Sequence, residues 1–154
     1  MPPPSSVNSV TSVTSVTSVT LVSGGNYQQR EALIVDLIAD LTVPSVKNLI
    51  ETPVTGTELH APGHRIAIIL EGLPGGDSVL SKSTTLLLQR IAPGCMCCIG
   101  NLAMRVTLNR LLRQRPAQLF IGIAITEHID KIRTFLSQAP YLDLLRLNPD
   151  QQIL

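Results

Sequence analysis

The chain has 154 residues, of which 44% are hydrophobic and only 3% aromatic, so it can bury the core of one ordinary domain, built mainly from aliphatic side chains. Its formal net charge of +1 gives no electrostatic case for a nucleic-acid partner or an anionic membrane surface. No apolar run approaches the roughly 18 residues of a membrane span, and MPPPSS is unlike a secretory signal, which predicts a cytoplasmic protein.

The N-terminal segment is repetitive. Residues 6–20 repeat the triplet SVT after one imperfect copy, and three prolines precede them. A period of three fits neither the strand period of 2.0 nor the helix period of 3.6. We therefore expect residues 1–17 to form a disordered low-complexity tail. A phosphorylated Ser/Thr tract is the functional alternative, for which the composition alone gives no support.

Apolar runs and helical periodicities alternate along the rest of the chain. The apolar runs predict strands at 20–25, 65–72, 84–94 and 117–125, and the periodicities predict helices at 30–41, 101–115 and 127–138. Strands separated by helices favour an α/β fold with a mostly parallel sheet of about four strands. Residues 43–63 are expected to be mainly a connection, and the chain after 139 has room for only a short helix.

The helical periods also predict which side chains face the core. The inward sets are Leu102, Val106, Leu108, Leu111 and Leu112 in the first of the two later helices, and Ile129, Ile132, Phe135 and Leu136 in the second.

All three cysteines lie in APGCMCCIG, at Cys95, Cys97 and Cys98. In a reducing compartment they stay thiols unless a metal or a reaction uses them. Zn²⁺ takes four ligands in a tetrahedron, so binding by all three thiolates needs a turn, which Gly94 and Gly100 permit. The candidates for the fourth position are water, a thiol of a second chain, His64, His128 and Glu71.

Two other uses of the cysteines stay open. Cys95 and Cys98 have the C-x-x-C spacing of dithiol redox centres and precede a predicted helix. Free cysteine is also common as a small buried residue, so all three could be inert core side chains.

The order of motifs resembles one family. Gly24 and Gly25 follow the first strand and precede a helix, as in a P-loop; an apolar strand then ends at Glu71, a Gly-rich loop reaches Asp77, and the next strand leads to GCMCC. This order, from about residue 18 to 145, resembles the CobW family of P-loop GTPases, relatives of UreG and HypB, which carry a GCxCC metal motif.

The resemblance implies a P-loop NTPase-like three-layer sandwich over residues 18–154. It implies a metallochaperone that binds zinc, GTP and Mg²⁺. The implied cofactor-binding residues are Gly24, Gly25, Arg30, Glu71 and Asp77, and the implied metal ligands are Cys95, Cys97 and Cys98.

The sequence departs from the family in the P-loop. Counted from Gly24, the last three positions of G-x-x-x-x-G-K-[ST] are Gln29, Arg30 and Glu31. Arg30 keeps the charge but not the compact ammonium of lysine. Glu31 would repel a phosphate by about 4 kcal/mol at roughly 4 Å and an effective dielectric near 20. These changes predict a former P-loop that now caps a helix, with GTP hydrolysis lost.

Two further departures concern the switch and the sheet edge. In IGIAITEH, Gly122 stands at the family's Glu position and Ile125 at its glycine, and His128 falls where relatives place His or Asp. No [NT]-K-x-D guanine-reading motif is present. A domain truncated to about four strands would leave a sheet edge open, which predicts a homodimer or a protein partner.

The leading hypothesis is a divergent CobW-like protein that handles zinc through GCMCC. One alternative is a working GTPase in which Arg30 replaces the P-loop lysine. Another is a non-functional fragment that depends on a partner.

Overall fold

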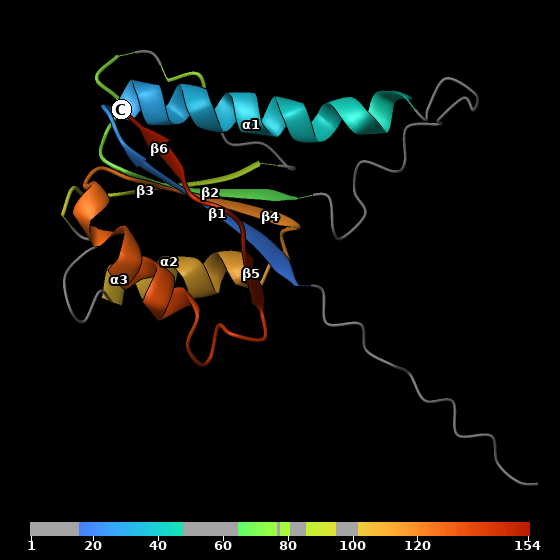
Figure 1. Ribbon diagram of the computed structural model, residues 1–154, viewed down its shortest axis with the longest axis vertical. Helices are drawn as coiled ribbons and strands as arrows, with labels where there is room; N and C mark the ends of the chain where they lie inside the picture. The colour runs from blue at the N-terminus through green and yellow to red at the C-terminus, as the bar shows by residue number, and fades with distance from the viewer. Residues whose placement is uncertain (1–15, 48–64, 77, 81–85, 95–101) are drawn as a thin grey trace, which may run out of the picture.

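The computed structural model describes residues 16–47, 65–76, 78–80, 86–94 and 102–154. A single parallel sheet lies between two helical layers (Figure 1). Helix α1 (Tyr27–Lys47) covers one face, and α2 (Leu102–Leu112) and α3 (Ile129–Leu136), preceded by the short turn η2 (Thr126–His128), cover the other. The predicted three-layer α/β fold with a mostly parallel sheet is confirmed.

The sheet has the strand order β3-β2-β4-β1-β5. The short strand β6 also pairs with β1, nearer the carboxyl end of β1 than β5 does. All the pairings described are parallel. The carboxyl ends of the strands therefore share one edge, where ligands bind in open α/β sheets. The strands are β1 (Thr17–Gly24), β2 (Ile66–Glu71), β3 (Leu86–Ile91), β4 (Gln118–Ile123), β5 (Leu145–Leu147) and β6 (Gln151–Ile153).

The sheet has two strands more than the sequence predicted. Residues after 139 were expected to form a short helix, but they contain β5 and β6 instead. β5 pairs with residues 17–19 of β1, and β6 pairs with residues 22–24. The C-terminal segment of the same chain therefore covers the edge of β1. On the other side, β3 is the last strand of the sheet within the described residues, so a partner at an open edge stays a prediction.

The helices differ from prediction at their ends and on one face. α1 is longer than 30–41 at both ends and runs through Pro44. In α2 the buried residues are Met104, Leu108 and Leu111, whereas Leu102 and Val106 are 71% and 56% exposed. The prediction for those two was wrong because the buried stripe includes Met104, and a residue two positions from it points away. The inward face predicted for α3 is confirmed.

The core has one layer on each face of the sheet. Val19, Leu21 and Ile121 pack with α2 and α3, while Val22, Ile68 and Phe120 pack with α1. This alternation is the one expected for strands buried on both faces. The predicted tail at 1–17 falls mostly outside the described residues, as does most of the 43–63 connection, but Thr17 belongs to β1 and residues 43–47 to α1.

Candidate functional site

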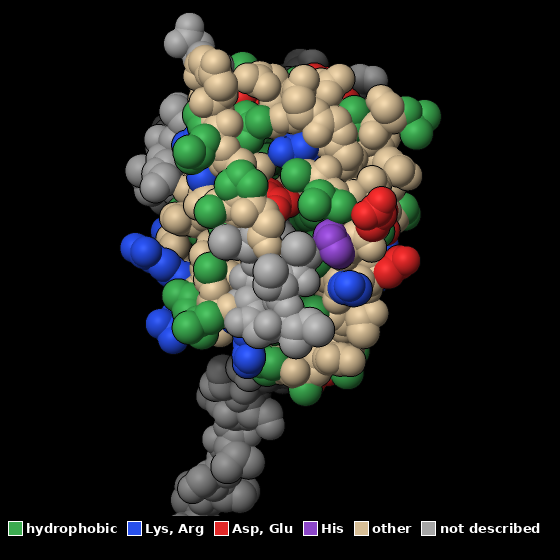
Figure 2. Space-filling model, turned by 90° about the vertical axis from the view of Figure 1, so that its left-hand side faces the viewer, with side chains coloured by type: hydrophobic (Ala, Val, Ile, Leu, Met, Phe, Trp, Pro, Cys, Tyr) green, Lys and Arg blue, Asp and Glu red, His purple; other side chains and the backbone are tan. Residues whose placement is uncertain are grey.

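The carboxyl edge of the sheet is the candidate site. In Figure 1, β1 reaches this edge where α1 begins, close to the C-terminus of the chain. Figure 2 looks onto the same side of the molecule, where acidic, basic and histidine side chains lie among mostly uncharged surface. Among the described helices, none is long and apolar enough to cross a membrane.

Gly24 and Gly25 form the turn between β1 and α1, at the predicted P-loop position. Their φ angles are +83° and +58°, a region that favours glycine. A Cβ on Gly24 would lie 2.5 Å from the Ile153 carbonyl oxygen, and one on Gly25 would lie 2.8 Å from Ile153 Cγ2. Both glycines are thus required by the turn itself and by its contact with β6.

The start of α1 is closed by reciprocal side-chain hydrogen bonds. The Gln29 amide N–H donates to Asn26 Oδ1 at 2.9 Å, and the Asn26 N–H donates to Gln29 Oε1 at 2.8 Å. This is the geometry of a capping box, which satisfies backbone donors at a helix start. Gln29, at the position of the last P-loop glycine, therefore caps the helix, as the sequence predicted.

Arg30 is buried and binds backbone carbonyls. Its Nη1 donates to the oxygens of Gly24 at 3.0 Å and Gly25 at 2.6 Å, and its Nη2 donates to the Glu71 carbonyl oxygen at 3.0 Å. Burial lowers the pKa of the guanidinium from its ordinary value, while the Glu71 carboxylate and Tyr27 favour the charged form. The fork of Arg30 thus links the β1–α1 turn to the end of β2.

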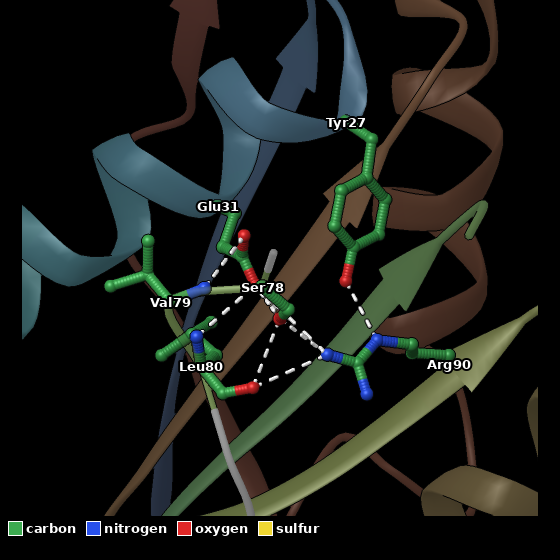
Figure 3. Close-up of polar contacts among 6 residues, drawn as sticks. All are labelled: Tyr27, Glu31, Ser78, Val79, Leu80 and Arg90. Carbon is green, nitrogen blue, oxygen red and sulfur yellow. Dashed lines mark hydrogen bonds and ion pairs between the residues drawn. The ribbon is translucent and has the colours of Figure 1, made fainter. Parts of the chain in front are cut away.

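Glu31 holds the loop that follows β2 (Figure 3). Its carboxylate accepts hydrogen bonds from the Ser78 hydroxyl, from the Leu80 N–H at 3.2 Å and from the Val79 N–H at 3.4 Å. The side chain is 2% exposed. Glu31 stands where the P-loop has its Mg²⁺ ligand, but in this structure the carboxylate is directed to residues 78–80.

Arg90 on β3 completes this partly buried polar cluster (Figure 3). Its Nη2 donates to Ser78 Oγ at 2.7 Å and lies 4.0 Å from Glu31 Oε1, and its Nε donates to the Tyr27 hydroxyl at 2.7 Å. The cluster joins α1, β3 and the loop after β2. Sequence reasoning missed Ser78 and Arg90, since neither belongs to a recognisable motif.

Glu71 connects the ends of three strands. It lies at the end of β2 and is 2% exposed. Its Oε1 accepts a hydrogen bond from the Gly94 N–H at 2.5 Å, and its Oε2 accepts one from the Ala124 N–H at 2.7 Å. Gly94 follows β3 and Ala124 follows β4. The sequence singled out Glu71 but missed Ala124, whose backbone rather than its side chain makes the contact.

The structure brings together four of the five predicted cofactor-binding residues: Gly24, Gly25, Arg30 and Glu71. The fifth, Asp77, and the three predicted metal ligands, Cys95, Cys97 and Cys98, lie outside the described residues, as does His64. Within the described part of the chain, no group of three or more His, Cys, Asp or Glu side chains could hold a metal ion.

One described metal-ligand candidate has an unused nitrogen. The Nδ1 atom of His128 is buried and has no hydrogen-bond partner among the described residues. His128 ends η2, four positions after the Ala124 N–H that Glu71 holds.

Comparison with known proteins gives one informative match. Over 89 residues the chain is 36% identical to the zinc chaperone YeiR of Escherichia coli (strain K12). The match covers 54% of this chain and 27% of the relative, so this chain spans about a quarter of that protein's length. No family model and no solved structure matches the chain.

Proposed function

We propose that this chain handles Zn²⁺ as its cargo. The chain is CobW-like over about half of its length, in agreement with the resemblance noted from its sequence. The observation that carries the proposal is the match to a zinc chaperone, itself a member of the CobW family. Cys95, Cys97 and Cys98 are the proposed ligands. A cytoplasmic location, where thiols stay reduced, is part of the proposal.

The chemistry of the three cysteines suits a transferable metal. Thiolates bind Zn²⁺ well, and three of them leave one of the four tetrahedral positions for water, for His128 or for a thiol of a second chain. A shell completed by an exchangeable ligand releases its metal more readily than a closed Cys₄ site. Transfer to a partner therefore fits this site better than a structural role.

Zinc titration tests the proposal. We expect the full chain to compete with a chromophoric chelator for Zn²⁺, and the variant with Cys95→Ser, Cys97→Ser and Cys98→Ser to lose this ability, because a hydroxyl is a poor Zn²⁺ ligand. Met96→Ser changes a non-ligating side chain in the same segment and should bind like wild type. One Zn²⁺ per two chains would point to a shared site in a homodimer. Equal binding by wild type and the triple variant would exclude the cysteines.

We further propose that GTP hydrolysis has been lost. The support is that the three residues in place of G-K-[ST] are all engaged within the protein: Gln29 caps α1, Arg30 binds carbonyls and Glu31 binds the loop after β2. No lysine or hydroxyl stands where phosphate and Mg²⁺ need them. The residues present do not fit GTP·Mg²⁺.

A nucleotide titration separates this reading from that of a working GTPase. A fluorescent GTP analogue should show no Mg²⁺-dependent saturation in the micromolar range, because Arg30 is already bound to Gly24, Gly25 and Glu71. Saturable, Mg²⁺-dependent binding that Arg30→Ala abolishes would instead assign Arg30 the role of the P-loop lysine.

A further inference from the structure

The carboxylate of Glu71 is the point where β2, β3 and β4 are tied together at the candidate site. Each of its oxygens accepts one backbone N–H, from Gly94 at 2.5 Å and from Ala124 at 2.7 Å. A second contact joins β2 to β3 nearby, since the Gly72 N–H donates to the Ile91 carbonyl oxygen at 2.8 Å. The backbone at Gly94 is therefore fixed relative to two neighbouring strands.

The hydrogen bond between Glu71 and Gly94 matters because of where Gly94 lies in the sequence. Gly94 directly precedes Cys95, the first of the three cysteines, and its φ of +79° turns the chain there. The Glu71 hydrogen bond is a contact that orients the backbone as it enters the cysteine segment.

We propose that Glu71 is a positioning residue for the cysteines, which rests on the zinc-handling function proposed above. It acts through the Gly94 N–H, since both carboxylate oxygens accept hydrogen bonds from backbone donors. Arg30 extends the same support, since its Nη2 binds the Glu71 carbonyl oxygen. Glu71 thereby contacts both Arg30 of α1 and Gly94, the residue that precedes Cys95 in the sequence.

Glu71→Gln removes this support while keeping the side chain's size. A carboxylate accepts at both ends, whereas an amide accepts at one end and donates at the other. Its NH₂ group would face either the Gly94 N–H or the Ala124 N–H, and one of these buried donors would lose its acceptor. We expect Zn²⁺ affinity to fall by about 10- to 100-fold, as is usual when a group that orients a ligand is removed.

Glu31→Gln is the matched control. Glu31 is also 2% exposed and also accepts two backbone N–H groups, but these belong to Val79 and Leu80 in the loop after β2. A general loss of stability would weaken Zn²⁺ binding in both variants. A positioning role of Glu71 would weaken Zn²⁺ binding in Glu71→Gln but not in Glu31→Gln.

The full-length wild type, Glu71→Gln and Glu31→Gln are compared by three measurements. These are Zn²⁺ affinity by chelator competition, amide hydrogen exchange at 94 and 124, and thiol alkylation rates in the metal-free protein. In Glu71→Gln alone we expect weaker Zn²⁺ binding and severalfold faster alkylation. Amide exchange should be about tenfold faster at 94 or 124, whichever N–H loses its acceptor, since a hydrogen bond to a charged acceptor is lost there. If Glu71→Gln does not fold, Glu71→Asp, which shortens the carboxylate's reach, takes its place.

The outcomes separate the two proposals. Exchange that is unchanged at both 94 and 124, unchanged Zn²⁺ affinity in Glu71→Gln, or an equal loss of affinity in Glu31→Gln would overturn the positioning role and leave zinc handling intact. A wild type that binds no Zn²⁺ would overturn zinc handling. The alkylation rates would then decide whether Glu71 orients the segment: a rate change confined to Glu71→Gln supports it, and equal rates refute it.

Discussion

Gly122 lies where the hydrophobic core leaves no room for a side chain. It lies in β4, opposite Leu70 of β2, at a position where the family pattern has Glu. A Cβ on Gly122 would lie 2.5 Å from Leu70 Cδ2 and 3.6 Å from Ile34 Cδ1. Leu70 and Ile34 are both fully buried, so neither can move into solvent. The space of the missing side chain is thus filled by the hydrophobic core.

Gly122→Ala should therefore lower the free energy of unfolding by about 1–3 kcal/mol, the usual cost of overpacking a core. Urea denaturation measures this change. Gly76→Ala is the control, because no atom of the described residues lies within 4 Å of its added Cβ, and it should stay within about 0.5 kcal/mol of wild type or gain stability. The double variant with Leu70→Ala should lose less than the sum of the two single losses. Simple additivity would show that Gly122 and Leu70 do not compete for the same space.

The P-loop region shows what residue identities alone predict. The sequence identified Gln29, Arg30 and Glu31 as departures from the family and assigned a cap to the helix start, which the structure bears out at Gln29. It did not predict the distant partners of Arg30 and Glu31, namely Glu71 and residues 78–80, which lie 41 to 49 positions away along the chain. Such contacts depend on which strands are neighbours in the sheet, and local patterns do not carry that information.

Among the elements, prediction succeeded where a pattern was long. The four apolar runs and three helical periods all correspond to elements of the structure, with shifted ends. β5 and β6 were missed because each has three residues, too few to show the alternation of a strand. The buried face of α2 was predicted correctly at Leu108 and Leu111 but not at Leu102 and Val106. These two are as apolar as the residues that are buried, and only packing against the sheet selects among them.

At the scale of the whole molecule, the C-terminal segment closes one side of the sheet. Between β5 and β6, the Asn148 N–H donates to the Val19 carbonyl oxygen at 2.8 Å. From α3, Arg133 Nη2 donates to the Asn148 carbonyl oxygen at 3.2 Å, and the guanidinium forms an ion pair with Asp150. The segment is thus held both by β1 and by the helical layer, and β6 brings Ile153 against Gly24 and Gly25 of the β1–α1 turn.

Removing residues 145–154 should expose the outer edge of β1, a strand that is buried along almost its whole length. An unpaired apolar edge favours association with other chains, so we expect the shortened protein to form dimers or larger species in size-exclusion chromatography with light scattering. Its free energy of unfolding should fall by about 2–4 kcal/mol, through the loss of strand hydrogen bonds and of the burial they maintain. Deletion of Leu154 alone is the control, because this residue is fully exposed and lies outside β6. A shortened protein with the same oligomeric state and stability as that control would mean that β5 and β6 do not protect the edge of β1.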